Sequence, residues 1–334
     1  MDFPRLQLAI LAGLWLLIWV LVPHAGGFWT SASALLVLAV LVYQCYWIYP
    51  YTGLHRREVE NRVIRPGDTR PTLRMLNSNV LMTNRNSEPL LSLIRQHQPD
   101  IVITLESDQW WQDKLDTLDG YIHRIRCPLD NLYGMHVYSR LPLTESRIDY
   151  LVEDDKPSMS ALVNLDSDHQ IQLHVVHPAP PAPGENDEST ERDVELLMLA
   201  KALEERNNRI IVAGDLNDVA WSATTRLFRQ LSGLLDLRVG RGLFNTFHAE
   251  HWYARWPLDH IFVSSHFEVV DIRRLPYIGS DHFPLLVELG MTDDTQSDNA
   301  VVEEEVDEER LESILQSSTA ENAQAPVVQL DGGQ

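Results

Sequence analysis

The chain has 334 residues, 44% of them hydrophobic, and a formal net charge of −21 from 27 Lys and Arg against 48 Asp and Glu. Its central part lacks clusters of Lys and Arg. A protein that grips duplex nucleic acid normally presents such a basic face, so generic duplex binding is disfavoured. Two cysteines, Cys45 and Cys127, offer no disulfide framework and leave the redox compartment open.

Two uncharged apolar runs open the chain, at 6–22 and 32–51. Each is close to the roughly twenty residues that a helix needs to span a bilayer. The first run contains two tryptophans and the second contains one tryptophan and four tyrosines, in part as in the aromatic belts of membrane proteins. We therefore expect a two-helix transmembrane hairpin over 1–52. A signal peptide is the alternative for the first run, but a second run follows it without an intervening small-residue cleavage site.

Basic residues indicate the orientation of this hairpin. Arg5 precedes the first run, the connecting loop has no Lys or Arg, and four arginines follow the second run: Arg56, Arg57, Arg62 and Arg65. By the positive-inside rule both ends of the hairpin face the cytoplasm. We thus expect a multi-pass protein of the inner or cell membrane with a cytoplasmic C-terminal domain. The opposite orientation is the alternative.

A linker over 53–72 leads to a single predicted catalytic domain over 73–290. Strand and helix patterns alternate there, which favours an α/β fold. The predicted elements with the clearest patterns are helices at 87–97 and 186–205 and strands at 161–165 and 171–176.

Polar side chains stand where apolar strands of this domain give way to loops. The segments are LNSNVL at 76–81, PDIVITLE at 99–106, VVHP at 175–178, IIVAGDLN at 210–217, PLDHIFV at 257–263 and GSDHFP at 279–284. Open α/β sheets build their sites at such strand ends. Asp215 and Asn217 are two residues apart on a strand and can reach one ligand together. A carboxylate and an amide suit a hard cation bound to phosphate oxygens.

This ordered set of motifs resembles the endonuclease/exonuclease/phosphatase superfamily over about 73–289. These metal-dependent phosphoesterases include deoxyribonuclease I, abasic-site endonucleases, neutral sphingomyelinases and inositol polyphosphate phosphatases. The resemblance implies a four-layered α-β-β-α sandwich of two mixed sheets with the site at one end. The two predicted transmembrane helices would precede it.

The resemblance also implies how this chain would bind a metal and a phosphate. Glu106 would be a ligand of Mg²⁺, with Mn²⁺ as an alternative ion, and Asp281 would lie beside the metal. Asn79 and Asn217 would hold the phosphate. Mg²⁺ prefers oxygen ligands and keeps several waters, so one or two carboxylates suffice.

The implied catalytic residues are two acids and two histidines. Asp215 would orient or deprotonate the attacking water, and His282 would contact the scissile phosphate while Asp259 holds its tautomer. His177 would be a second phosphate contact. These roles define a phosphodiester hydrolase that uses metal-assisted attack of water.

One residue departs from the family's pattern, and one further motif suggests a different metal. His136 stands where many members carry an apolar residue, which leaves its role open. The sequence HAEH at 248–251 raises the alternative of a zinc site, although its spacing is not the helical pattern of zinc proteases.

An acidic tail over 291–334 ends the chain, with the block EEEVDEE at 303–309. This composition predicts disorder with at most a short helix at 310–316. The complete prediction is a membrane-anchored, metal-dependent phosphoesterase acting on nucleic acid or on a lipid or inositol phosphate, with no obvious protein partner. A catalytically inactive binding or scaffold protein is the alternative.

Overall fold

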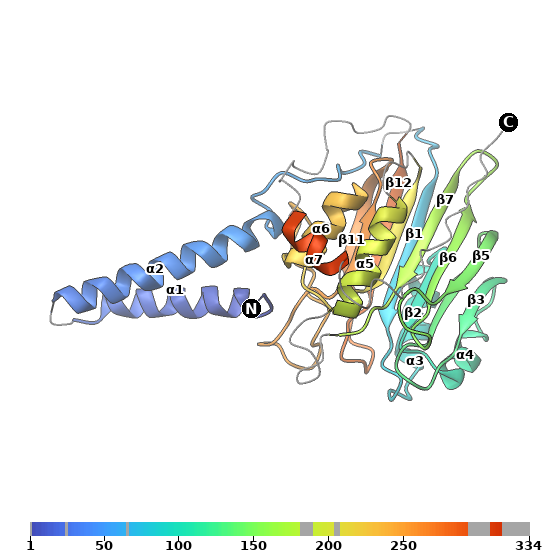
Figure 1. Cartoon of the computed structure of the whole chain (residues 1–334). Coiled ribbons are helices and arrows are strands. Elements are labelled where there is room, and N and C mark those ends of the chain that lie inside the picture. The colour runs from blue at the N-terminus through green and yellow to red at the C-terminus, as the bar shows by residue number, and fades with distance from the viewer. Residues whose placement is uncertain are drawn as a thin grey trace.

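The computed structural model describes residues 2–23, 26–64, 67–180, 190–203, 208–292 and 308–315. Two six-stranded mixed sheets lie face to face, with strand orders β11-β12-β1-β2-β4-β3 and β5-β6-β7-β8-β10-β9. Helices cover the outer faces of the sheets (Figure 1). The predicted four-layered sandwich is therefore confirmed.

The elements have the following bounds. The first sheet contains β1 (Thr72–Asn79), β2 (Ile101–Leu105), β3 (His123–Cys127), β4 (Met135–Ser139), β11 (Phe267–Arg274) and β12 (Leu285–Met291). The second contains β5 (Leu143–Asp149), β6 (Ser158–Asn164), β7 (Gln170–Val176), β8 (Ile210–Asp215), β9 (Leu235–Asp236) and β10 (Asp259–Val263). The helices are α1 (Arg5–Leu21), α2 (Phe28–Ile48), the 3-10 turn η1 (Tyr49–Tyr51), α3 (Glu88–His97), α4 (Gln109–Leu115), α5 (Thr190–Leu203), α6 (Ala223–Ser232) and α7 (Glu308–Leu315).

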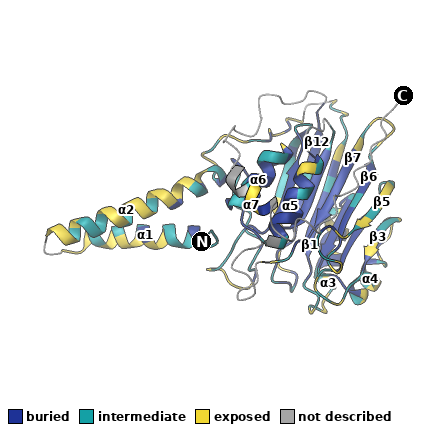
Figure 2. Cartoon of the chain, viewed as in Figure 1, coloured by how far each residue is buried: buried dark blue, intermediate teal, exposed yellow. Residues whose placement is uncertain are grey.

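The layers follow from the alternation of apolar side chains along each strand. On β1, Met75 points into the core between the sheets and Leu76 points outward to α3 and α4. On β8, Ile211 belongs to the central core and Val212 packs under α5 and α6. Successive strand residues face opposite sides, so continuous apolar runs give strands that are buried on both faces. Figure 2 shows this buried interior.

The predicted secondary structure of this domain agrees with the structure where it is described. The helix expected at 87–97 is α3, and the strands expected at 161–165 and 171–176 are β6 and β7. The helix expected at 186–205 is α5, with residues 186–189 and 204–205 outside the described part.

Strand pairing gathers the chemically active residues at one end of the sandwich. In the antiparallel pair β8–β10, Asp259 lies opposite Asp215. In the parallel pair β1–β2, Asn79 lies opposite Leu105, so Glu106 follows directly beside it. Residues far apart in sequence thus meet at a common edge.

Helices α1 and α2 lie side by side and project away from the sandwich (Figure 1), with largely exposed apolar side chains (Figure 2). Among the described residues, one helical stretch is long and apolar enough to cross a membrane, Phe28–Tyr51, with 24 residues and a mean hydropathy of 1.8. Helix α1 has 17 residues. That is about 26 Å of helix, short of the roughly 30 Å hydrocarbon core. The prediction of two spanning helices, and hence of a multi-pass protein, is therefore not supported.

The segment after α2 is packed against the sandwich. The hydroxyl of Tyr51 donates to the carbonyl of Ala220 at 2.6 Å, and Val59 is fully buried. Arg62 is buried and pairs with Asp68 at 2.8 Å. These contacts fix the base of α2 on the globular part.

The predicted tail begins too early at 291, because Met291 is the buried last residue of β12. Farther along the tail, the structure describes helix α7. Its Leu311 and Ile314 pack with Val194 and Leu197 of α5. A short helix expected at 310–316 thus corresponds to Glu308–Leu315. The rest of the predicted disordered tail, apart from residues 291–292, lies outside the described residues.

Candidate active site

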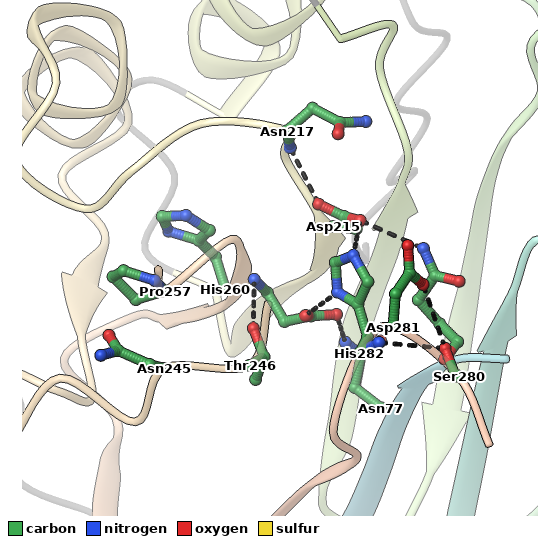
Figure 3. Close-up of polar contacts among 12 residues, drawn as sticks. Asn77, Asp215, Asn217, Asn245, Thr246, Pro257, His260, Ser280, Asp281 and His282 are labelled. Carbon is green, nitrogen blue, oxygen red and sulfur yellow. Dashed lines mark hydrogen bonds and ion pairs between the residues drawn. The ribbon is translucent and has the colours of Figure 1, made fainter. Parts of the chain in front are cut away.

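Asp215, Asp259 and His282 form the centre of the site, and all three are at least 97% buried. His282 Nδ1 lies 2.7 Å from Asp259 Oδ2, and His282 Nε2 lies 3.3 Å from Asp215 Oδ2. The imidazole therefore bridges two carboxylates that pair across β8 and β10 (Figure 3). Since a carboxylate can only accept, Asp259 fixes a proton on Nδ1 and directs Nε2 toward Asp215.

Two asparagines of β1 connect this centre to Glu106. The amide Nδ2 of Asn79 donates to Glu106 Oε1 at 2.8 Å and to Asp215 Oδ2 at 3.2 Å. Asn77, two residues earlier on the same face, donates to Asp259 Oδ1 at 3.1 Å. One strand thus holds three carboxylates through neutral amides, which add no charge to the site.

The predicted phosphate contacts His177 and Asn217 lie on the other side of Asp215. His177 Nε2 is 3.9 Å from Asp215 Oδ2, and among the described residues its Nδ1 has no hydrogen-bond partner. The backbone N–H of Asn217 donates to Asp215 Oδ1 at 2.9 Å (Figure 3). Its side chain donates to the carbonyl of Pro178 at 3.0 Å. Here the amide supports the loop after β7.

Asp281 is positioned by the turn before His282. Ser280 Oγ donates to the carbonyl of Asn79 at 2.8 Å and accepts from the N–H of His282 at 3.1 Å. The backbone N–H of Ala249 donates to the carbonyl of Asp281 at 2.6 Å. The Asp281 side chain is half-buried, as is Glu106, whereas the three central groups are enclosed.

The backbone is strained at two of these positions. Glu106 has φ of 53° and Asn217 has φ of 51°, both in the left-handed region that non-glycine residues rarely occupy. Strained backbone of this kind concentrates at functional sites, because the surrounding structure must hold it in place.

Burial and the crowding of charge shift the pKa values of the site. Burial opposes the charged form of His282, but the carboxylates of Asp215 and Asp259 outweigh it and raise the pKa of His282 to about 10. Burial raises the pKa of Asp215, with His282 acting against it. Burial lowers the pKa of His177, so this second imidazole is neutral near pH 7. The site thus pairs a protonated and a neutral histidine.

Glu106 has the properties of a metal ligand. Burial, followed by the charges of Asp215 and Asp281, raises the pKa of Glu106 to about 7, although its bond from Asn79 acts against this. Carboxylates that repel one another need a cation, and oxygen donors suit Mg²⁺. The donor set of Glu106 and Asp281 therefore fits the predicted ion. Asp215, Asp259 and His282 also have ligand atoms within 4.8 Å of one another and form a second candidate position for a metal ion. The 2.7 Å bond to Asp259 occupies Nδ1 of His282 and leaves its Nε2 as the ligand atom.

The alternative zinc site at 248–251 gains no support. The rings of His248 and His251 lie 4.4 Å apart, but Glu250 accepts from the hydroxyl of Tyr277 at 2.9 Å. Within the described ranges, the cluster of Asp215, Asp259 and His282 is the one group of three potential ligands.

His136 supports the turn that carries Glu106. Its Nδ1 lies 2.6 Å from Ser107 Oγ, and burial lowers the pKa of His136 to about 4. The neutral ring is hydrogen-bonded to the serine hydroxyl and so anchors the residue next to Glu106. This contact gives His136 the role that the sequence left open, which is to position the turn at Glu106.

Two residues that sequence reasoning left without a role belong to the site. Asn77 bonds Asp259, and the alternation of side chains along β1 could have revealed it, because Asn77 and Asn79 share a face. The ring of Tyr133 lies 5.2 Å from that of His177. The sequence carries no signal for this contact between separate loops.

The fold is a sandwich of two mixed sheets, and buried acids and histidines from both sheets form its candidate site. A family model described as "Endonuclease/Exonuclease/phosphatase family" matches residues 76–282, and the chain belongs to this family. The match covers all the predicted site residues. No curated protein sequence matches the chain.

Solved structures support the fold independently. A humanized zebrafish TDP2 with 14 mutations superposes with a TM-score of 0.55 at 17% identity, over 66% of this chain and 99% of that chain. The human Nocturnin catalytic domain with bound sulfate gives 0.53 at 20% identity, over 67% and 96%. An endonuclease/exonuclease/phosphatase from Beutenbergia cavernae gives 0.53 at 15% identity, over 66% and 72%.

Proposed function

We propose that this protein is a membrane-anchored, divalent-metal-dependent phosphodiesterase. The observation that carries the proposal is the continuous chain of contacts from Asp259 through His282 to Asp215 and from there through Asn79 to Glu106. It joins an acid–base pair to a carboxylate that fits a metal. We assign 73–290 to the catalytic domain, 53–72 to the connection and 291–334 to the tail.

The residues of the chain divide the reaction between them. His282, protonated and held by Asp259, donates from Nε2 to an anionic phosphoryl oxygen. Asp215 orients the attacking water and accepts its proton, while neutral His177 contacts the phosphate. Asn217 acts through its backbone N–H, which holds Asp215, and its side chain supports the loop at Pro178. A bound Mg²⁺ or Mn²⁺ at Glu106 and Asp281 would supply charge neutralisation for the phosphate.

The membrane anchor in this proposal is α2, with α1 packed along it. Arg56, Arg57 and Arg62 follow the anchor and favour a cytoplasmic catalytic domain. A reporter fused after Leu289 should therefore show cytoplasmic location. An alkaline phosphatase fusion that is active at this position would reverse the orientation.

The rim of the active site adjoins the base of the anchor. Gln7 of α1 donates to the carbonyl of Tyr253 at 3.1 Å. A row of rings runs inward from there: Phe3 lies 5.9 Å from Trp256, Trp256 lies 6.1 Å from Phe247, and Phe247 lies 5.0 Å from His282. Trp252 in the same loop is 80% exposed, as expected of an aromatic side chain that meets a lipid surface.

This arrangement favours a lipid or inositol phosphodiester over a duplex nucleic acid, because a headgroup lies within reach of the rim. Zebrafish TDP2 has been solved with a single-strand DNA product, so single strands remain the second substrate class. An inactive scaffold is less favoured because every predicted acid and histidine is present.

A substrate panel tests the proposal on the full-length protein in detergent. It contains plasmid DNA, single-stranded DNA, RNA, sphingomyelin and phosphoinositides, with Mg²⁺ or Mn²⁺. We expect turnover of a lipid phosphodiester that is lost in the double variant Asp215→Ala, His282→Ala. If none of these substrates is hydrolysed, the result favours the inactive scaffold protein.

A further inference from the structure

A cavity of about 340 Å³ lies where α2 meets the sandwich, away from the residues of the active site. The end of α2 and the turn η1 form one wall, with Trp47 and Tyr51. Helix α6 forms the other wall, with Arg226 and Arg229. Figure 1 shows α2 running into the globular part beside α6.

The walls combine aromatic rings with positive charge. The guanidinium carbon of Arg226 lies 4.4 Å from the centre of the Trp47 ring, and the rings of Tyr51 and Trp221 are 6.0 Å apart. Arg229 forms an ion pair with Glu58 at the edge of the cavity. Glu58 is also engaged by the backbone N–H of Asp236 at 2.9 Å. With one acid and two arginines in its lining, the cavity has a positive excess.

Two buried donors of this cavity have no acceptor. Among the described residues, neither the indole Nε1 of Trp47 nor the Nε of Arg229 has a hydrogen-bond partner. Arg229 is 92% buried, because its relative exposure is 8%. A buried donor without a partner destabilises the fold, so such groups normally meet a ligand or water. The cavity therefore offers donors and positive charge, while its one acid, Glu58, is already engaged by Arg229 and by the N–H of Asp236.

The position of the cavity in the molecule indicates which anionic group would serve as the acceptor. The apolar helix Phe28–Tyr51 ends at this cavity, and exposed Tyr46 and Tyr49 flank its last turn. Aromatic side chains at the end of a spanning helix mark the level of the lipid headgroups. Exposed Arg57 follows in the chain and adds basic charge at the same level.

We propose that this cavity binds the phosphate headgroup of an anionic phospholipid. The phosphate accepts from Trp47 and Arg229 and is neutralised in part by Arg226, while the acyl chains lie along α2. This inference rests on the membrane anchor of the proposed function but not on catalysis. The bound lipid would fix the base of α2 against α6 and so hold the catalytic domain at the membrane surface.

Native mass spectrometry of the full-length protein, released from nanodiscs, tests this site. The nanodiscs contain phosphatidylcholine with a minor share of phosphatidylglycerol. We expect one retained phosphatidylglycerol per protein. Trp47→Phe removes the indole donor and keeps a ring, and Arg226→Gln removes a charge. Each change should lower retention about tenfold, as expected for a lost hydrogen bond or charge contact to an anion.

The matched controls are Trp29→Phe at the opposite end of α2 and Arg95→Gln on α3, which should retain the lipid as the wild type does. Hydrolysis of bis-p-nitrophenyl phosphate is measured on every variant and should be unchanged, so loss of the lipid site is separated from loss of catalysis. Equal retention of both lipids, or unaltered retention in Trp47→Phe and Arg226→Gln, would overturn the proposal. If millimolar inorganic phosphate displaces the lipid, the cavity binds free phosphate and the assignment to a lipid headgroup is wrong.

Discussion

Asp259 lies opposite Asp215 in the β8–β10 register, yet the two carboxylates face the same imidazole from different sides. Two like charges in a buried space are costly, and His282 between them offsets this cost by carrying a proton. The register of a single strand pair thus determines both the protonation and the orientation of His282.

Asp259→Asn should lower turnover by about 10²-fold, because the amide can no longer fix the proton on Nδ1 of His282. The loss of a charge that raises the pKa of His282 should also move the alkaline limb of the pH–rate profile to lower pH. Metal titration of the variant should match that of the wild type. Half-buried Asp271→Asn on the edge strand β11 is the control. If the alkaline limb of the pH–rate profile is unchanged in Asp259→Asn, Asp259 does not raise the pKa of His282.

Glu106→Gln should weaken metal binding, since charge on the ligand sets much of the affinity of a hard cation. The rate should fall and then recover in part as Mg²⁺ is raised. Activity measured as a function of metal concentration checks this, with Glu88→Gln on the surface of α3 as a control. Superimposable metal curves for the variant and the wild type would show that Glu106 is not a ligand.

Gly214→Ala should destabilise the fold by about 3 kcal/mol or more. A Cβ atom at this position would lie 1.9 Å from the carbonyl oxygen of Val176 on β7, and φ is 152°. Gly233→Ala is the matched control, because its Cβ would meet nothing within 4 Å and only its φ of 66° is unfavourable. It should cost about 1 kcal/mol. Denaturant unfolding measures both, and equal losses would contradict the close approach of the two strands.

The stability of the fold should fall between about pH 4.5 and pH 8 through Glu195 of α5. Burial, together with the charge of Glu153, raises the pKa of Glu195 to about 8 in the folded state. A carboxyl group whose pKa is higher in the folded than in the unfolded state stabilises the fold at pH values below its unfolded-state pKa. This contribution is lost as the pH rises through the folded-state pKa. Glu195→Gln should therefore gain stability relative to the wild type at pH 9 but not at pH 4. Half-buried Glu191→Gln on the same helix is the control, and identical thermal profiles for both variants would exclude this role.

The sequence was sufficient for the parts of the site that depend on strand ends. Glu106, Asp215 and Asp259 each follow or begin an apolar run, and the periodicity of buried strands locates such residues directly. The sequence does not predict contacts between separate loops. Tyr133 precedes β4 of one sheet and His177 follows β7 of the other, so they meet only because the two sheets pack together.

The N-terminal helices show a different limit of sequence reasoning. Apolar composition alone extended the first predicted span to 6–22, while the helix ends at Leu21 before Pro23 and begins at Arg5. Arg5 is buried by its ion pair with Asp2 and its bond to Gln44 of α2 at 3.3 Å. Polar contacts of this kind depend on the partner helix and cannot be read from hydropathy.

The central claim is that metal and the Asp215–His282 pair act together in phosphodiester hydrolysis. The most direct measurement is turnover of bis-p-nitrophenyl phosphate by the full-length protein in detergent, after chelation and after return of Mg²⁺ or Mn²⁺. We predict no turnover after chelation, recovery with either ion, and loss of about 10²-fold or more in His282→Ala. Turnover that survives chelation, or that is unchanged in the double variant Asp215→Ala, His282→Ala, would contradict the claim.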